Sequence, residues 1–194
     1  MERIQIVTQR ITRGRLLVSE VDDRWVSIDN NGLVLYVSFI LEETECSSED
    51  SIMEQRIPKI VKGLMTAKLA TVSGWRSDHS DAQSIQSLVS SDPPNPTCIV
   101  IIPQATLAGK LRPGDKYLKY HRQVGRARGN ELYKFFINQV ITFFNHFSSL
   151  SVTSGDRNQC EIIPNILSIV WGTFGGRQGF EMMSSGPSTH FFQY

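Results

Sequence analysis

The fold is decided by the stretch Cys98–His121, CIVIIPQATLAGKLRPGDKYLKYH. It begins with five residues, 98–102, that are apolar and mostly β-branched, and a short run of this kind is typical of a buried strand. Pro103 has no amide hydrogen to donate, so we expect the strand to end there. Small or polar residues follow at once: Gln104, Ala105 and Thr106. Because loops that leave a core strand often carry functional residues, the stretch predicts a site directly after a rigid strand, with an ordinary solvated loop as the alternative.

Outward from this strand, the sequence predicts further strands and two main helices. Apolar residues recur at helical spacing over 51–65 and 130–147, with Pro58 predicting a late start or a kink in the first helix. The expected strands cover 4–18 with a bend near Arg13-Gly14, and 25–28, 32–40, 68–72, 162–171, 178–183 and 189–193. Strands and helices in separate blocks favour an α+β fold with a curved, barrel-like mixed sheet.

Length and composition are those of a single globular domain over residues 1–194. The chain is 40% hydrophobic and 20% charged, which excludes the fibrous and disordered classes. The polar segment 73–96 is expected to form an excursion outside the core. The longest apolar stretch, 33–41, is far shorter than the roughly 20 residues of a membrane helix, so we expect no membrane span. Three widely spaced cysteines and a charged N-terminal segment favour a reducing, cytoplasmic location.

Familiar catalytic motifs are missing from the sequence. The glycine-rich segment 172–179 lacks the Lys-Ser/Thr pair of a phosphate loop, which favours a tight connection between strands. The four histidines show no metal-ligand spacing, and no Gly-x-Ser-x-Gly elbow is present. We therefore expect neither a metal nor a cofactor, and little classical side-chain catalysis.

Positive charge is concentrated in the tract 110–134. The tract holds eight Lys or Arg residues and two acidic ones, a local charge of +6 in a chain of net charge +1. Such an asymmetry is what binding to a phosphate backbone uses. Tyr117 and Tyr120 lie within the tract and could stack on unpaired bases. A solvated basic loop is an equally open interpretation of the tract alone.

Several motifs, in order along the chain, resemble those of the D-aminoacyl-tRNA deacylase family. The segment 103–107, PQATL, is similar to the family's Ser-Gln-Phe-Thr-Leu motif, and 185–189, SGPST, to its Asn-Gly-Pro-Val-Thr motif. The segments 8–13 and 172–175 resemble two further family motifs, and the resemblance spans nearly the whole chain except 73–96. Tyr120-His121 and the Gly-Pro-Ser-Thr-His run at 186–190 are closest to the animal-type branch of the family.

The resemblance implies a homodimer that hydrolyses the ester between an amino acid and the 3′ adenosine of tRNA. In the family, the Gly-Pro turn of one subunit reaches the site of the other. A cis turn excludes L-amino acids, whereas the trans turn of the animal-type branch enlarges the pocket and admits L-alanine mischarged on threonine tRNA. Ala105, in place of a bulky Phe, fits a roomier pocket, and Ser185, in place of Asn, leaves the hydrogen bonding of the turn open.

The resemblance also assigns site residues in three groups. The catalytic corner is Gln104, Ala105 and Thr106, with backbone N–H groups near Ala105-Thr106 stabilising the oxyanion and the ribose 2′-hydroxyl assisting water. Thr106 as a nucleophile is the alternative, although the sequence indicates no His or Lys partner for it. The expected substrate-binding residues are Gly186, Pro187, Ser188, Thr189 and Phe174. The expected tRNA-binding residues are Lys110, Arg112, Lys116, Lys119, Tyr120, His121 and Arg122.

Two other functions remain open at this point. A non-catalytic tRNA- or RNA-binding module would use the same basic tract, and a small-molecule esterase would act without tRNA. The expected partners of the deacylase are aminoacyl-tRNA and a second copy of the chain.

Overall fold

A six-stranded mixed sheet lies at the centre of the computed structural model, which describes residues 1–41, 53–72, 81–120, 122–145, 159–163 and 165–194. The strand order is β10-β11-β7-β4-β1-β13. The strands are β1 (Glu2–Ile11), β4 (Gly32–Leu41), β7 (Thr97–Pro103), β10 (Cys160–Ile163), β11 (Leu167–Trp171) and β13 (Thr189–Gln193). Strand β7 runs parallel to both neighbours, and the other pairs are antiparallel. The strand predicted at 98–102 is therefore an inner strand, and it is buried on both faces.

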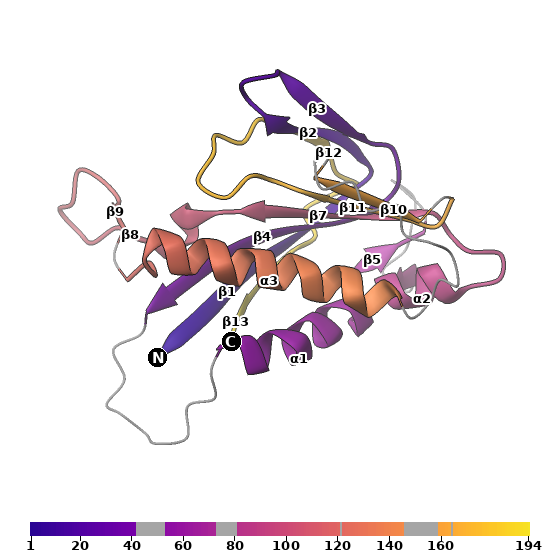
Figure 1. Ribbon diagram of the computed structural model, residues 1–194, viewed down its shortest axis with the longest axis horizontal. Coiled ribbons are helices and arrows are strands. Elements are labelled where there is room, and N and C mark those ends of the chain that lie inside the picture. Colours follow the sequence, from indigo (N-terminus) through magenta and orange to yellow (C-terminus); the bar gives the residue numbers. More distant parts are fainter. Residues whose placement is uncertain (42–52, 73–80, 121, 146–158, 164) are drawn as a thin grey trace.

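Two helices, α1 (Met53–Thr66) and α3 (Arg126–Asn145), cover one face of this sheet (Figure 1). The core between them joins sheet residues such as Leu35 and Ile99 to helix residues such as Ile57 and Phe136, all at most 1% exposed. Burying each such side chain contributes about 1.5–3 kcal/mol, so the helices are held mainly by their apolar faces. Pro58 lies inside α1.

A smaller sheet, ordered β12-β2-β3, packs on the opposite face (Figure 1). Its strands are β2 (Arg13–Ser19), β3 (Arg24–Ile28) and β12 (Phe180–Met183). A second apolar cluster joins the two sheets, with Leu16 and Ile28 from the smaller sheet against Val34 and Val100 from the larger. Two short ladders complete the described strands: β5 (Ala70–Thr71) with β6 (Ala82–Gln83), and β8 (Gly109–Lys110) with β9 (Lys119–Tyr120).

The long strand expected over 4–18 is divided between the two sheets. The break falls at Thr12, whose amide donates to the carbonyl of Met183 at 2.8 Å. Gly14 lies beside the backbone of Glu181 in β12, so closely that a Cβ atom would overlap the Glu181 carbonyl. The bend near Arg13-Gly14 is therefore the point where the chain leaves one sheet and enters the other.

The strand expected over 162–171 is instead a hairpin of β10 and β11. Asn165 has a positive φ of 61°, a conformation that Asn tolerates better than most residues, and this allows the reversal. The segment 162–171, which is apolar over most of its length, therefore contains parts of two strands and not one.

Segment 73–96 was expected outside the core, and its described part, 81–96, corrects that expectation. A short helix, α2 (Ile85–Ser90), inserts Ile85 and Leu88 into the main core, where both are at most 1% exposed. Its first turn is capped by the Ser84 hydroxyl, which accepts from the Ser87 amide at 2.9 Å. The polar composition of the segment thus hides three buried apolar residues, because Val89 belongs to the same core cluster as Ile85 and Leu88.

Helix α3 begins at Arg126, four residues before the expected start, so Asn130, which the sequence predicts as the first residue and cap of this helix, lies inside it. The buried face is formed by Leu132, Tyr133, Phe136, Ile137, Val140 and Phe144. The expected end at Phe147 lies outside the described residues.

The fold class is confirmed as α+β, with a mixed sheet and two main helices. The larger sheet remains open, with β10 and β13 at its edges, and the smaller sheet covers part of one face. Among the helices of the described residues, none is long and apolar enough to cross a membrane.

Candidate functional site

A cavity of about 380 Å³ lies where β4, β7 and the start of α3 meet. The lining comes from four chain segments: Val37–Phe39, Pro103–Ala105, Gln123 to Gly129 in part, and Phe174–Gly176. Three residues that the sequence assigns to a site, Gln104, Ala105 and Phe174, therefore share one cavity, although Phe174 is about seventy residues from the other two in the chain.

The loop after β7 folds into a single 3-10 turn over Ala105–Ala108. Its entry is fixed because the Gln104 amide donates to the Val37 carbonyl at 2.8 Å. The Ala105 carbonyl accepts from the side chain of Gln123 at 2.8 Å. Among the described residues, the amides of Ala105 and Thr106 have no acceptor, as is usual for the first amides of a helical turn. Ala105 lines the cavity, and Thr106, which is not among the lining residues, follows it directly in the turn.

The Thr106 hydroxyl accepts a hydrogen bond from the Gln104 side-chain amide. An amide donor cannot remove a proton from the hydroxyl, so this contact does not activate Thr106 as a nucleophile. In the described part of the chain, no His or Lys bonds to it.

The glycine-rich connection 172–179 presents Phe174 to the cavity and is not a phosphate loop. Thr173 anchors it through a hydroxyl bond to the Val18 carbonyl at 3.0 Å, and Gln178 donates to the Thr173 carbonyl at 2.6 Å. Gly175 has φ +72°, which a residue with a side chain rarely adopts. The tight strand connection favoured by the sequence is what the structure contains.

Titratable groups are scarce around the cavity. Among its described lining residues, Arg126 carries the one charged side chain, and no carboxylate, histidine or cysteine is present. The nearest cysteine in the sequence, Cys98, lies inside β7, where burial raises the pKa of its thiol to about 12. The described wall of the cavity thus offers amides and a guanidinium rather than a side-chain base.

The Gly-Pro turn lies just before β13, at the edge of the larger sheet. Gly186 has φ +143°, and Asp92–Pro93 is the cis bond among the described residues, so Gly186–Pro187 is trans. Gln9 on β1 fixes the turn by donating to the Ser184 hydroxyl at 2.8 Å and to the Gly186 carbonyl at 3.2 Å.

Further contacts of the Gly-Pro turn are also made with residues of β1. The Ser188 carbonyl accepts from the Arg10 amide at 3.4 Å, and the Thr189 hydroxyl contacts the Gln9 side chain. Ser184 donates to the Gly186 carbonyl at 2.7 Å, so the described side-chain hydrogen bonds to this carbonyl come from Ser184 and Gln9 and not from Ser185. None of residues 186–189 lines the cavity of the same chain.

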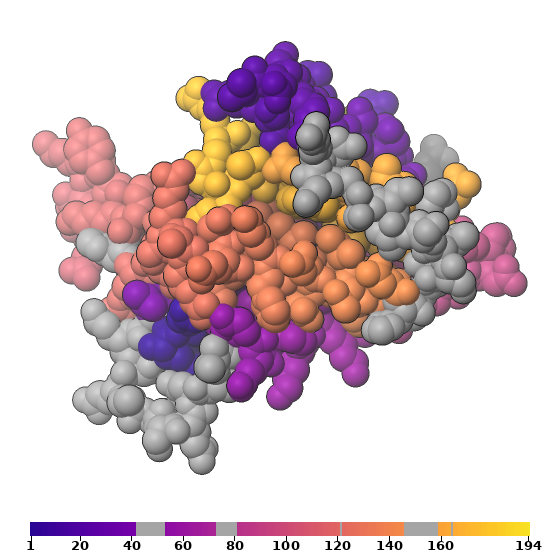
Figure 2. Space-filling view, in the orientation of Figure 1, coloured from indigo at the N-terminus to yellow at the C-terminus, as the bar shows by residue number. Residues whose placement is uncertain are grey.

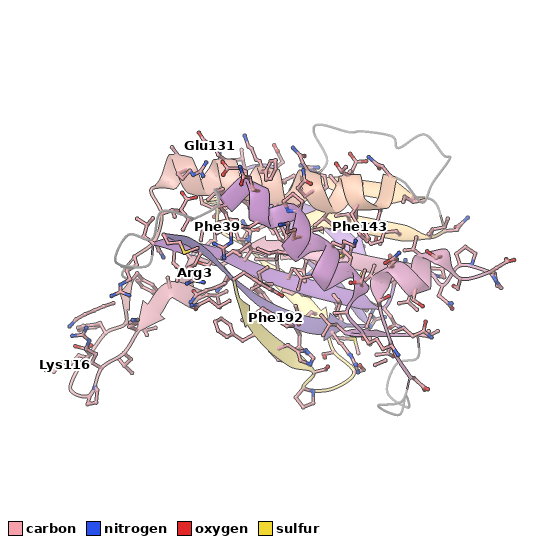
Figure 3. All side chains as sticks on the ribbon, turned by 90° about the horizontal axis from the view of Figure 1, so that it is seen from below. Arg3, Phe39, Lys116, Glu131, Phe143 and Phe192 are labelled. Carbon is pink, nitrogen blue, oxygen red and sulfur yellow. The ribbon has the colours of Figure 1, made fainter. Side chains whose placement is uncertain are left out.

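The first half of the basic tract forms a hairpin that projects from the body of the protein, with Lys116 near its tip (Figures 1 and 3). Its exposed residues include Lys110, Arg112, Lys116, Lys119 and Tyr120, and Arg122 is exposed just beyond it. The ammonium of Lys119 lies 2.7 Å from the carboxylate of Asp115. His121 lies outside the described residues.

Sequence reasoning missed four residues that shape the site. Gln123 holds the turn at Ala105, and Arg126 and Gly129 line the cavity from α3. Gln9 holds the Gly-Pro turn, although the motif at 8–13 already pointed to its neighbourhood. Because each acts through a contact with a distant segment, no local pattern identifies it.

Comparisons with known proteins agree with this geometry. The profile of the D-Tyr-tRNA(Tyr) deacylase family matches residues 7–193. A D-aminoacyl-tRNA deacylase 2 from Danio rerio is 26% identical, covering 99% of each chain. The protein of that name from Homo sapiens is 26% identical over 96% of this chain and 92% of its own. A solved structure of a probable eukaryotic D-amino acid tRNA deacylase shares the fold, with a TM-score of 0.75, 24% identity and coverage of 99% and 100%.

The class defined by these matches is that of hydrolases acting on ester bonds. Within this class, the chain belongs to the D-Tyr-tRNA(Tyr) deacylase family.

Proposed function

We propose that this protein removes D-amino acids from tRNA, and L-alanine mischarged on threonine tRNA, by hydrolysing the ester to the 3′ adenosine. The observation that carries the proposal is the cavity lined by Ala105, in a chain of the deacylase family. The amides of Ala105 and of the next residue, Thr106, have no acceptor within the described part of the chain. Such a reaction corrects charging errors before they enter translation.

The chemistry needs little from side chains, because an aminoacyl ester is already activated. The amides of Ala105 and Thr106 donate to the oxyanion that develops on the ester carbonyl. The neighbouring 2′-hydroxyl of the ribose assists the attack of water, and the cavity holds the 3′ end in place. The scarcity of titratable groups in the described lining supports this division of work between protein and RNA.

The extension to L-alanine rests on two features of the site. Gly186–Pro187 is trans, the state that in the animal-type branch accompanies a larger pocket. Ala105 also leaves space that a bulky side chain would fill. Both features favour relaxed chiral selection for a small amino acid.

The proposed active form is a homodimer. The cavity and the Gly-Pro turn lie in different parts of one chain, and a second copy brings the turn of one subunit to the cavity of the other. Strand β13 supports this arrangement, because it is an edge strand with an exposed Phe191 beside the turn. In register with it, Val7 and then Tyr36 continue an apolar row across the sheet.

The proposed tRNA surface is the projecting hairpin with Lys110, Arg112, Lys116, Lys119 and Tyr120, together with Arg122 just beyond it. His121, which the sequence also assigns to tRNA binding, lies outside the described residues and stays a prediction. The length and positive charge of the hairpin suit the acceptor stem, and exposed Tyr117 and Tyr120 suit unpaired bases near the 3′ end. Arg128 does not belong to this surface, because its guanidinium is bound by Glu2 and Glu54.

The discriminating experiment incubates the protein with D-Tyr-tRNA, with L-Ala-tRNA(Thr) and with a small aryl ester. We expect both tRNA esters to be cleaved and the aryl ester to survive. If both tRNA esters survive while tRNA binds, the protein is a binding module. Turnover of the aryl ester alone would identify a small-molecule esterase.

The backbone mechanism predicts opposite outcomes for two neighbouring substitutions. Thr106→Ala keeps both amides, so we expect kcat within about tenfold of the unsubstituted protein, whereas loss of a nucleophile costs several orders of magnitude. Ala105→Pro removes one amide hydrogen at the first position of the turn, where proline is tolerated, and should lower kcat about 10²–10³-fold.

Single-turnover deacylation of D-Tyr-tRNA measures both effects, with circular dichroism and tRNA binding as controls for folding. Abolished activity in folded Thr106→Ala, or full activity in Ala105→Pro, contradicts the backbone mechanism.

A further inference from the structure

Helix α3 contains a glycine at the point where it meets the cavity wall. Gly129 is buried, and a Cβ atom there would lie 2.7 Å from Cζ and 3.5 Å from Cε2 of Phe174. At a distance below 3.0 Å one of the two groups must shift, so an alanine side chain at 129 requires the Phe174 ring to move. The absence of a side chain at 129 lets the ring lie back against the helix.

Tyr133, one turn further along α3, fixes the two strand ends beside this ring. Its hydroxyl lies 2.9 Å from the carbonyl oxygen of Ile101 in β7 and 3.1 Å from that of Gly172 after β11. Its ring packs against that of Phe174, with centroids 5.7 Å apart. The segments that lead to Ala105 and to Phe174 are therefore tied to the same side chain.

We propose that Gly129 is a positioning residue for the aminoacyl-tRNA site: it sets how far Phe174 extends into the cavity. An alanine at 129 pushes the ring toward the space that the 3′ end of the substrate occupies. This inference rests on the proposed function, because it assigns the residue a role in binding that substrate.

The test compares Gly129→Ala with a matched control, Gly63→Ala. Gly63 lies within α1 with nothing within 4 Å of a Cβ atom, so alanine there improves helix propensity and touches nothing. We expect Gly63→Ala to raise the thermal unfolding midpoint and to leave KM unchanged. We expect Gly129→Ala to raise KM about tenfold, the effect of removing space for roughly one methylene group.

The double variant Gly129→Ala/Phe174→Leu provides the rescue, because leucine lacks the Cζ and Cε2 atoms. Its KM should match that of Phe174→Leu alone within about twofold, and its unfolding midpoint should exceed that of Gly129→Ala, a coupling that only contacting residues show. If Gly129→Ala does not fold, the double variant should, and failure of both overturns the inference.

The outcomes separate the two proposals. If the unsubstituted protein and Gly63→Ala cleave D-Tyr-tRNA but Gly129→Ala has an unchanged KM, the positioning role is wrong and the proposed function stands. If KM rises in Gly129→Ala but Phe174→Leu restores nothing, the positioning role is again wrong. If the unsubstituted protein cleaves neither tRNA ester, the proposed function fails and the positioning role fails with it.

Discussion

Arg128 lies in the basic tract 110–134 of the sequence but has a structural role in the folded protein. Its guanidinium binds the carboxylate of Glu2 at 2.8 and 2.9 Å and that of Glu54 at 2.6 and 3.0 Å. Hydrogen bonds to Glu2 and then Glu54 raise the pKa of the guanidinium further. The residue therefore joins α3 to β1 and α1, and it contributes no free charge for RNA.

This cluster predicts a pH dependence of stability. The hydrogen bond from Arg128 lowers the pKa of the Glu54 carboxyl below its usual 4.5. Between the pKa of Glu54 in the folded protein and its value of 4.5 in the unfolded chain, the unfolded chain binds more protons than the folded one. The stability that the ion pair contributes is therefore fully present above pH 4.5, and it is lost as the pH falls through the pKa of Glu54 in the folded protein. We expect Glu54→Gln and Arg128→Met to be less stable than the unsubstituted protein at pH 7 and to lose less stability between pH 5 and 3.

Urea unfolding across that pH interval measures the effect. If the free energy of unfolding falls equally with pH in Glu54→Gln and in the unsubstituted protein, the predicted role of the Glu54–Arg128 ion pair is wrong.

At the scale of elements, the β8–β9 hairpin makes little contact with the core. It extends away from both sheets, as the space-filling view also shows at the end opposite α2 (Figure 2). Leu111 and Tyr117 on it are 64% and 81% exposed, so little apolar burial holds it. The hairpin can therefore adjust to a ligand without disturbing the core.

The hairpin predicts a salt-dependent defect in tRNA binding. Removing two cations with Lys110→Ala/Lys116→Ala should flatten the slope of log Kd against log salt by about 1–2, because each lost phosphate contact contributes about 0.7–0.9. The control Lys59→Ala/Lys62→Ala removes the same charge from the exposed side of α1 and should leave the slope unchanged. Filter binding of tRNA at several salt concentrations measures both. Equal slopes for the two double variants would show that Lys110 and Lys116 of the hairpin do not contact the phosphates of tRNA.

At the scale of the whole molecule, the separation of the cavity from the Gly-Pro turn predicts that assembly and activity change together. Phe191→Asp places a charge on the exposed apolar row of β13 and should weaken dimerisation and lower deacylation in parallel. Val21→Asp, at a residue 95% exposed in the turn between β2 and β3, is the matched control and should change neither. Sedimentation velocity over a range of concentrations gives the assembly state. A monomeric protein with full activity would contradict the shared site.

How much the sequence predicts depends on the range of the contacts involved. The strand at 98–102 and both main helices follow from local periodicity, and the cavity beside Gln104 and Ala105 follows from a strand that ends at a proline. The break at Thr12 does not, because it is set by β12, about 170 residues later in the chain. Gln9, Gln123 and Gly129 likewise act through contacts with distant segments that no spacing rule connects to them.

The pairing of β1 with β13 has a consequence for how the protein folds. The side chains of Gln5 and Gln193 are hydrogen-bonded across 188 residues of sequence, and Ile4 and Tyr194 exchange backbone hydrogen bonds, so this pairing closes nearly the whole chain into one loop. Contacts between such distant segments form slowly, since the entropy of closing the loop is lost before any pairing compensates it. Strand β1 can pair with β4 well before β13 arrives, and its other edge is then open to unwanted pairing. The Gly-Pro turn, carried at the start of that last strand, is accordingly expected to take its place in the final stage of folding.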